Sequence, residues 1–418
     1  MGLDEHGYSS SVVERIVTAT ARFSSFRDAT CAVRMSGVDI SASQVRRLAH
    51  EVGRELIAAR DRKVVEYRRR QLPARAAVIP RAVVVEVDGG RMRTRAANAA
   101  PGVHEAQNKE DKIACLATLE SRTFSCDPQP EPPESFRCPR RVQRLVAQMK
   151  GPAGEANTPE IPEEPVDAVA PLTETDATRR WSPERLVRTC VASLEASSSF
   201  GPMMAAEAQE RRFYEAAGRA FVADGMAYNW SVHAGYFRDF EPIVDFLHVL
   251  CYVYASARAV SRDESGGWSQ YLAWMRACWQ GRAEDVLREL DVWQVRLGES
   301  PPGEPTSAED RRDPRRLVSD ARSYLRNNQG RMAYPRYRCA GLPTTSGLVE
   351  SLVGEFNARV KDKRKHWTRP HGAESILQLR AAVLSGDDRL SRFFADRPGN
   401  PFRKKQRVGE ETAPQTAA

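Results

Sequence analysis

The stretch RAVVVEVDGGRMRTR, residues 81–95, joins an apolar run to an acid, two glycines and three arginines. Its β-branched first half predicts a strand that ends at Asp88. An acid at the end of a buried strand stays ionised only where a positive charge, most effectively a divalent metal ion, compensates it. Gly89 and Gly90 leave room for a bulky substrate close to the backbone. The arginines that follow suit contacts with phosphate groups: Arg91, Arg93 and Arg95.

Two further acids stand in similar settings. Asp224 lies in AFVADGMAYNW, where it again ends an apolar run and precedes a glycine. Glu350 lies in LPTTSGLVESLVGEF, where Thr344, Thr345 or Ser346 is expected to cap a helix that carries the glutamate in its first turns. Two aspartates and a glutamate that converge can hold two Mg²⁺ or Mn²⁺ ions and support in-line phosphoryl transfer. For either aspartate, the alternative is a plain exit from a strand into a turn.

The N-terminal region has the pattern of helices separated by one sharp break. Residues 11–35 and 42–70 are predicted to be helical. The break, SGVDIS, contains Gly37 for a tight turn, and Ser41 or Ser43 can cap the helix that follows. This is the layout of a helix-turn-helix, and an ordinary solvated helical hairpin is the alternative.

Two segments are strongly basic. Between residues 44 and 75 there are ten Arg and Lys residues against four acids, a balance that suits phosphate contacts, and Arg46 and Arg47 are the DNA-binding candidates there. The second segment follows Glu350 and reads RVKDKRKHWTR. Its candidates for contacts with the DNA backbone are Arg359, Lys361, Lys363, Arg364 and Lys365, and Trp367 is a candidate for stacking on an unpaired base.

Composition limits the choice of partner. The formal net charge of +8 favours a polyanion such as nucleic acid or an anionic membrane surface. The longest apolar stretch, PIVDFLHVLCYVYASARAV, is interrupted by Asp245 and His248 and is too short to span a membrane, so we expect a cytoplasmic protein without a membrane partner. The eight cysteines include no CxxC pair, which argues against a zinc knuckle or a disulfide framework and for reduced thiols.

The rest of the chain reads as a mixed α/β pattern. Further strands are predicted at KIACLATLESRTF and RAFVADG, residues 112–124 and 219–225. Ten of the 26 prolines fall between residues 127 and 180, which predicts a mobile insertion with one short helix at RVQRLVAQM. A helix-rich part follows, and its tryptophans are expected in a core: Trp230, Trp268, Trp274, Trp279 and Trp293.

Four motifs in this order, VEVDGGRMRTR, VADGMAYNW, FEPIVDFLHVLCYV and TTSGLVESLVGEFNARVKDKRKHWTR, resemble those of the DDE transposases of bacterial insertion sequences. The similarity is greatest to the ISKra group, which is related to the Mutator-like transposases. It implies an RNase H-like mixed sheet with a helical insertion, preceded by an all-α helix-turn-helix region. It also implies that Asp88, Asp224 and Glu350 form a metal-binding catalytic triad, and that Asp245 and His248 lie near the active site or the transposon end. From its residues alone, His248 can donate to a phosphate or orient a carboxylate, or it is a histidine satisfied at the start of a core helix.

The resemblance and the composition together imply a division into seven segments. They are a helix-turn-helix region (1–75), the first part of the catalytic domain (76–126), a proline-rich mobile insertion (127–180), the continued catalytic domain (181–250), a helical insertion (251–340), the catalytic helix with its basic segment (341–405) and a disordered tail (406–418).

The expected function is therefore metal-dependent cleavage and strand transfer at terminal inverted repeats. The partners implied are two Mg²⁺ or Mn²⁺ ions and double-stranded DNA, both as transposon ends and as target. A homodimer or higher oligomer on DNA follows from the need to join two ends, in a chain associated with the bacterial nucleoid. The alternatives are a nuclease on the same fold that does not transfer strands, a DNA-binding regulator with a decayed catalytic domain, and a structural or RNA-binding protein.

Overall fold

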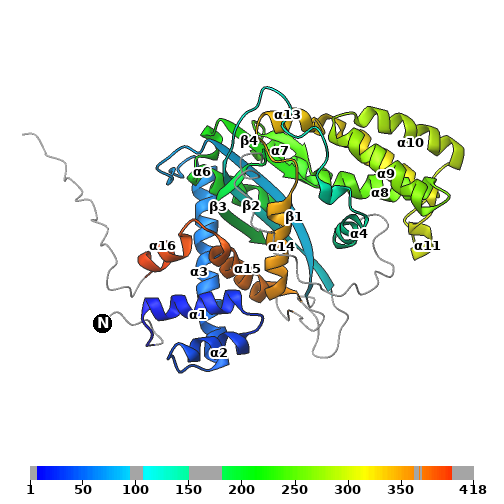
Figure 1. Cartoon of the computed structure of the whole chain (residues 1–418). Coiled ribbons are helices and arrows are strands. Elements are labelled where there is room, and N and C mark those ends of the chain that lie inside the picture. Colours follow the sequence, from blue (N-terminus) through cyan, green and yellow to red (C-terminus); the bar gives the residue numbers. More distant parts are fainter. Residues whose placement is uncertain (1–6, 95–106, 150–180, 362–366, 368–369, 398–418) are drawn as a thin grey trace, which may run out of the picture. The chain divides into compact units, whose positions relative to one another are not determined.

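The computed structural model describes residues 7–94, 107–149, 181–361, 367 and 370–397 (Figure 1). The chain divides into two compact units. The sheet unit comprises residues 59–93 and 107–355, and the helical unit comprises residues 1–58, 94–106 and 356–418. Within the described residues, no helix combines the length and the apolar character needed to cross a membrane.

The sheet unit is built on a five-stranded sheet with the strand order β3-β2-β1-β4-β5. The strands are β1 (Ala82–Thr94), β2 (Gln107–Glu120), β3 (Glu184–Ser193), β4 (Gly218–Ala223) and β5 (Glu241–Val244). β1 runs parallel to β4 and β4 runs parallel to β5, whereas β2 and β3 are antiparallel. The prediction of an α/β fold with a mixed sheet is therefore confirmed.

β1 does not end at Asp88, as the sequence suggests, but continues to Thr94. Its parallel ladder with β4 stops at Val87, while β2 remains its neighbour on the other side. The glycine at position 89 allows this close pairing, because a Cβ atom on Gly89 would lie 3.2 Å from the backbone oxygen of Asp111 in β2. Asp88 therefore lies in the middle of β1, at the position where the pairing with β4 has stopped.

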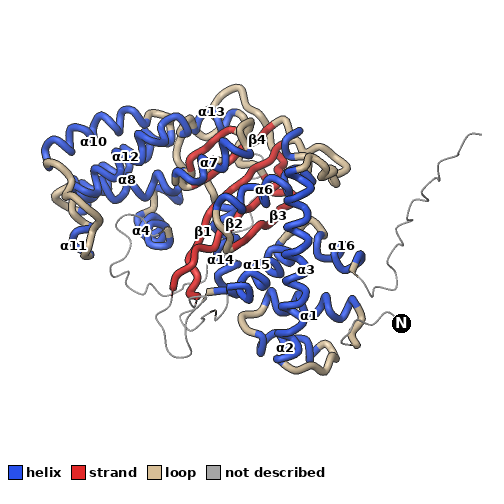
Figure 2. Tube along the Cα trace, turned by 180° about the vertical axis from the view of Figure 1, so that it is seen from behind, coloured by secondary structure: helices blue, strands red, loops and turns tan. Residues whose placement is uncertain are grey.

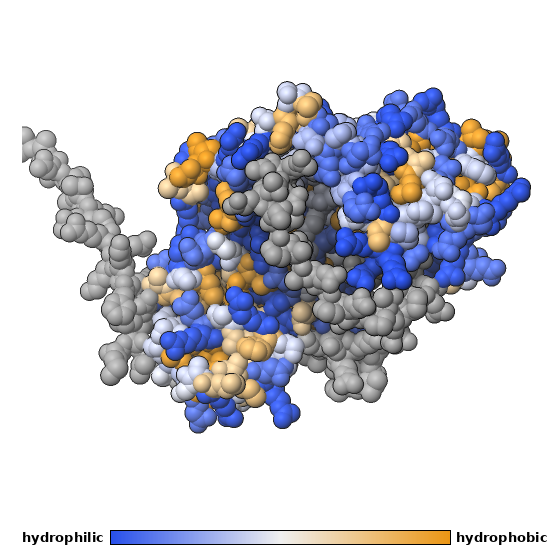
Figure 3. Space-filling view, in the orientation of Figure 1, coloured by the Kyte–Doolittle hydropathy of each residue, from blue (hydrophilic) through white to orange (hydrophobic). Residues whose placement is uncertain are grey.

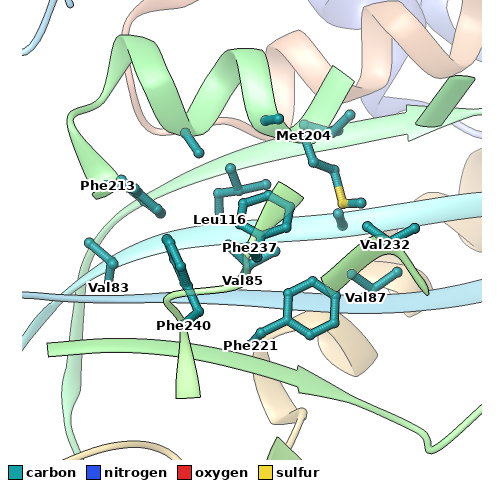
Figure 4. Packing of buried hydrophobic residues seen from close by; sticks show 14 of the residues in the cluster. Val83, Val85, Val87, Leu116, Met204, Phe213, Phe221, Val232, Phe237 and Phe240 are labelled. Carbon is teal, nitrogen blue, oxygen red and sulfur yellow. The ribbon is translucent and has the colours of Figure 1, made fainter. Parts of the chain in front are cut away.

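One face of the sheet holds the apolar core of the unit. Val83, Val85 and Val87 alternate along β1 and point to this face, where they pack with Phe221 of β4 (Figure 4). The helices α6 (Ser197–Glu210) and α7 (Ala227–Tyr236) cover it, and α6 crosses the near side of the strands in Figure 2. The side chains that complete this core include Met204, Phe213, Val232, Phe237 and Phe240.

The opposite face takes the other set of β1 side chains, which includes Glu86 and Asp88. Helix α14 (Gly347–Val360) begins there, because the backbone N–H of Val349 donates to the Glu86 carboxylate. In Figure 1, α14 lies on the near side of the sheet, away from the core face. The face is therefore polar where the acids stand.

Between β5 and α14 the chain forms a helical layer. Its helices are α8 (Phe246–Val260), α9 (Glu264–Trp279), α10 (Ala283–Leu297), α11 (Ala308–Arg311), α12 (Pro314–Asn328) and α13 (Tyr334–Cys339). Trp274 and Trp279 are buried, which confirms the prediction of core tryptophans at these two positions. In the view of Figure 3, hydrophilic side chains cover most of the described surface of this layer, and apolar ones form small separate groups.

The stretch from 127 to 149, predicted as the start of a mobile insertion, makes defined contacts. It contains a 3-10 turn (Glu134–Phe136) and helix α4 (Pro139–Gln148), so the predicted short helix is confirmed. Asp127 accepts a hydrogen bond from Nε of the buried Arg338 at 2.7 Å, because that guanidinium needs a compensating charge. The expected mobility stays a prediction, and residues 150–180 lie outside the described residues.

The helical unit contains α1 (Ser10–Arg22), α2 (Phe26–Met35), the first part of α3 (Ala42–Arg68), α15 (Pro370–Leu384) and α16 (Arg389–Asp396). Gly37 has a φ of 85°, and the Ser41 hydroxyl accepts from the backbone N–H of Gln44 at 3.2 Å. Apolar side chains of α1, α2 and α3 form one cluster around Ile16, Val33 and Leu48. The helices predicted in residues 11–70 are therefore confirmed, together with the turn and the cap.

Candidate active site

Three aspartates stand side by side at one edge of the sheet. In the register of the parallel strands, Val87 of β1 pairs with Ala223 of β4, and Ala223 pairs with Val244 of β5. The residues that directly follow these three are Asp88, Asp224 and Asp245. Because the strands are parallel and in register, the three carboxylates leave the sheet at the same edge.

Glu350 reaches this edge from α14. The loop before the helix is tied to β5, since the backbone N–H of Ser346 donates to Asp245 Oδ1 at 2.9 Å. The hydroxyl of Ser346 then donates to Glu350 Oε1, also at 2.9 Å. Ser346, one of the three predicted capping residues, directly precedes the helix. One serine therefore links the helix glutamate to an aspartate of the sheet.

The carboxylates influence one another. Burial raises the pKa of Asp88, and the negative charges of Asp224 and Asp245 raise it further. Burial, followed by the charges of Asp245 and Asp88, raises the pKa of Glu350 to about 7. Raised carboxyl pKa values with these causes show that negative charge is crowded at this edge of the sheet.

His248 is the positively charged group among these carboxylates. Its Nδ1 lies 2.7 Å from Asp245 Oδ2, and Asp245 also caps α8 by accepting from the backbone N–H of Leu247. Burial disfavours the imidazolium, but the hydrogen bond to Asp245 and the charges of Asp245 and Asp224 raise the pKa of His248 to about 9. The residue is thus both a partner of the first turn of a core helix and a cation at neutral pH.

Asp224 is fixed from two sides. Its Oδ1 accepts from the backbone N–H of Met226 at 3.0 Å and from the side chain of Asn229 at 2.8 Å. Its backbone oxygen accepts from the hydroxyl of Tyr324 in α12 at 2.9 Å. Gly225 has a φ of 90°, and a Cβ atom there would come within 2.9 Å of Tyr324, so the loop requires glycine. The helical layer therefore supports the loop that carries Asp224.

The oxygens of the four acids differ in availability. Both oxygens of Asp245 accept hydrogen bonds. Within the described residues, no hydrogen bond reaches Oδ2 of Asp88, Oδ2 of Asp224 or Oε2 of Glu350. As the side chains stand, the described residues include no group of three or more His, Cys, Asp or Glu arranged to hold a metal ion. The three predicted acids thus share one edge of the sheet, each with one available oxygen.

Glu86 is a site residue that the sequence analysis missed. It is 0% exposed, and its Oε2 accepts from the backbone N–H of Val349 at 2.8 Å. Burial raises the pKa of Glu86 well above its ordinary value. The available signal was an acid inside a run of valines, two positions before Asp88 and so on the same face of the strand.

Four of the predicted DNA-binding arginines have exposed side chains. Arg46 and Arg47 lie in the first half of α3, in the helical unit. Arg91 and Arg93 lie in β1 beyond Asp88, in the sheet unit. Both of these arginines therefore follow Asp88 in the same strand, towards its C-terminal end.

Arg359 is buried instead, at 3% exposure. Its Nε donates to the backbone oxygen of Thr20 at 2.8 Å, and Arg380 donates to the backbone oxygen of Ala21. These carbonyls belong to the last turn of α1, where a helix leaves acceptors without partners of its own. Burial lowers the pKa of Arg359 to about 10. The prediction of a DNA contact is corrected accordingly, because Arg359 caps a helix.

The other predicted contacts are partly described. Lys361 is half-buried. The indole N–H of Trp367 donates to the backbone oxygen of Val360 at 3.0 Å, and its backbone forms a bridge with Thr94. The remaining predicted residues lie outside the described residues: Arg95, Lys363, Arg364 and Lys365.

Comparison with known proteins adds no assignment to this geometry. No model of a protein family matches the sequence, and no curated protein matches it.

Proposed function

We propose that the protein is a transposase that cleaves DNA at transposon ends and joins them to a target. The observation that carries the proposal is the convergence of Asp88, Asp224 and Glu350 at one edge of the sheet, each with an available carboxylate oxygen. The sheet unit would then be an RNase H-like domain, and α2 with α3 a helix-turn-helix.

The order of the elements supports this reading. The first acid lies on the first strand, the second directly follows the fourth strand, and the glutamate lies on a later helix. A helical layer separates the second acid from the glutamate. This is the arrangement that the resemblance to the DDE transposases implies.

The donor chemistry of these residues suits the two divalent cations that such an enzyme would use, although the described side chains as they stand are not grouped around a common ion position. Carboxylate oxygens are the ligands that Mg²⁺ and Mn²⁺ prefer, and the available oxygens belong to Asp88, Asp224 and Glu350. Burial, and then repulsion between carboxylates, raises the pKa of Asp88 and of Glu350, and a bound cation would relieve both effects. When bound, the cations stabilise the negative charge that develops on the attacking and leaving oxygens of the phosphodiester.

The chain's own groups have separate tasks at the scissile phosphate. Asp245 holds the imidazole of His248 through Nδ1, which leaves Nε2 free to donate to a phosphate oxygen. Arg91 and Arg93 are exposed further along the strand that carries Asp88 and suit backbone phosphates at a distance from the cut. In the helical unit, Arg46 and Arg47 suit the backbone of the transposon end.

The reaction has two steps of the same type. Water attacks the phosphorus at the transposon end, the P–O3′ bond breaks, and a 3′-hydroxyl is released. That hydroxyl then attacks a phosphodiester of the target, and the target's own 3′-oxygen leaves. Both steps are in-line displacements that proceed without a covalent protein intermediate. Joining two ends requires at least two copies of the chain on the DNA.

The test uses the terminal inverted repeats that the proposal expects on either side of the gene for this chain. A labelled, pre-cut end is incubated with Mg²⁺ and a supercoiled plasmid, and a covalently joined product is the expected result. Asp88→Ala, Asp224→Ala and Glu350→Ala should each abolish joining while repeat binding persists. Nicked plasmid without joined product would indicate a nuclease. Binding without any DNA chemistry, unchanged by the three substitutions, would indicate a regulator.

A further inference from the structure

Glu86 is a buried carboxylate to which the proposed chemistry gives no role. Its side chain lies on the same face of β1 as Asp88, two positions earlier in the strand. It is fully buried, and burying an acid in an otherwise apolar strand is unfavourable unless hydrogen bonds compensate. A strand that needs only apolar packing would carry valine at this position, as at 84 and 85.

The compensating hydrogen bonds come from the first turn of α14. Glu86 Oε2 accepts from the backbone N–H of Val349, and the backbone N–H of Leu348 contributes as well. The N–H of Val349 also donates to the backbone oxygen of Ser346 at 3.0 Å, so Glu86 shares this donor with the turn and ties the turn to β1. The positive end of the helix dipole points the same way. Residue 350 follows directly, so the fixed turn carries the catalytic glutamate.

A second contact holds the same helix further along. Arg188 of β3 forms two hydrogen bonds to Glu355, of 2.8 and 3.1 Å. Glu350 therefore lies between two side-chain links from α14 to the sheet, and the link from Glu86 is one residue away from it. The strand that supplies Asp88 also supplies this nearer link.

We propose that Glu86 is a positioning residue: by holding the N–H of Val349 it fixes the first turn of α14 and so sets where the Glu350 carboxylate lies relative to Asp88. This inference rests on the proposed function, since it concerns the geometry of the triad. It predicts that the hydrogen-bond acceptor, and not merely a group of the right size, is required at position 86.

The experiment compares three variants of the full chain. Glu86→Leu keeps the approximate volume and removes the acceptor, whereas Glu86→Gln keeps an acceptor oxygen for Val349. Val84→Ala is the matched control, because Val84 is equally buried on the same face of β1 but provides no side-chain acceptor. Two readouts are taken: turnover and KM in end cleavage, and amide hydrogen exchange at Val349 without DNA.

Glu86→Leu is expected to lower kcat by about 100-fold with little change in KM, the effect expected when a catalytic group is displaced by about 1 Å. Exchange at Val349 should become faster by about tenfold, which corresponds to the loss of one hydrogen bond. Glu86→Gln should restore most of the activity and the slow exchange. Val84→Ala should lower the melting temperature without either effect.

Unchanged turnover or unchanged Val349 exchange in Glu86→Leu would overturn the proposal, as would an equal loss of turnover in Val84→Ala. If Glu86→Leu does not fold, Glu86→Asp replaces it, since the shorter side chain withdraws the acceptor from Val349 and should give the same pair of effects. A wild-type chain that neither cuts nor joins DNA overturns the proposed function instead. In that case the exchange rate of Val349 alone decides whether Glu86 fixes the turn.

Discussion

At the scale of single residues, the candidate site is defined by an excess of negative charge that one imidazolium partly offsets. Asp88, Asp224, Asp245 and Glu350 share an edge of the sheet, and His248 is the cation whose pKa their charges raise. In the absence of metal ions, the protonation of this histidine is therefore linked to folding.

The stability of the metal-free protein should decrease as pH rises from 6.5 to about 9. The folded-state pKa of His248, about 9, lies above its ordinary value of 6.5, so the folded protein binds the extra proton across this interval. The stabilisation is complete below pH 6.5 and is lost as pH passes 9, with a magnitude of about 3 kcal/mol. Denaturant unfolding with a chelator, between pH 6 and 9.5, measures it.

His248→Gln should flatten this slope, and His233→Gln, which changes a histidine bonded to the backbone oxygen of Phe240, should leave it intact. A slope that survives in His248→Gln would show that another group titrates.

Asp88→Asn should separate stability from activity. Removing the charge ends the unfavourable burial of a carboxylate and the repulsion by Asp224 and Asp245, which together outweigh the lost attraction to His248, so the melting temperature in chelator should rise. End cleavage should fall by about 1000-fold or more, as when one group that stabilises transition-state charge is lost. Scanning calorimetry and a gel-based cleavage assay measure the two effects. Loss of both stability and activity would mean that Asp88 is needed for folding.

At the scale of elements, the helical layer supports the ends of the parallel strands. The hydroxyl of Tyr324 donates to the backbone oxygen of Asp224, and that of Tyr334 donates to the backbone oxygen of Val244, each at 2.9 Å. Two contacts from later helices thus hold the ends of β4 and β5, next to Asp224 and Asp245. Tyr324 lies 100 residues after Asp224, and Tyr334 lies 90 residues after Val244.

Tyr324→Phe should test this support with the loss of a single oxygen atom. Tyr271→Phe is the matched control, because the Tyr271 hydroxyl donates to the backbone oxygen of Phe136 at the same distance of 2.9 Å, away from the acids. Each substitution should lower the free energy of unfolding by about 1 kcal/mol. Only Tyr324→Phe should lower the cleavage rate, by about tenfold or more, because it releases the Asp224 loop. Equal rates would exclude a supporting role.

Two arginines with the same predicted role should behave differently. Arg359→Ala removes a buried cap of α1 and should lower the free energy of unfolding by about 2–3 kcal/mol, the value of hydrogen bonds from a charged donor. Arg47 is exposed on α3, so Arg47→Ala should change the free energy of unfolding by no more than about 0.5 kcal/mol. It should instead reduce the salt dependence of DNA binding by about one unit of log–log slope. Chemical denaturation and binding titrations at several salt concentrations measure both effects.

The sequence predicts elements best where one pattern dominates. The apolar periodicity and the caps locate α1, α2 and α3, and short apolar runs locate β1, β2 and β4. β3 was missed because its first half, ERLVR, has charged and exposed residues at the edge of the sheet. β5 was missed because it has only four residues. Such short or polar strands are defined by their neighbours, which the local sequence does not contain.

The same limit applies to the site. Asp88, Asp224 and Glu350 could be proposed because each stands out from an apolar surrounding. Glu86 could not, because its partner, the backbone N–H of Val349, carries no side-chain signal. Arg359 belongs to a basic run, and the sequence therefore predicts a DNA contact for it. Its burial against the last turn of α1 shows instead that it caps this helix.

At the scale of the whole molecule, the net charge of +8 should govern encounters with DNA. Affinity for DNA without inverted repeats should fall steeply as salt rises, because each phosphate contact releases counterions. Between 50 and 200 mM salt, a loss of about 10³-fold is expected if six or more phosphates are neutralised. Fluorescence anisotropy on a random duplex measures this. Affinity that does not change with salt would show that the basic side chains do not meet phosphates.

The order of the acids along the chain has a consequence for synthesis. β1, which carries Asp88, and β4, which Asp224 follows, have left the ribosome long before α14, the helix that carries Glu350, is translated. A chain grows from its N-terminus at about 5–20 residues per second, so a polypeptide still under construction lacks the third acid for several seconds. If the proposed function holds, the nascent chain has its N-terminal helices before it has Glu350, so it should be unable to cleave DNA until α14 emerges.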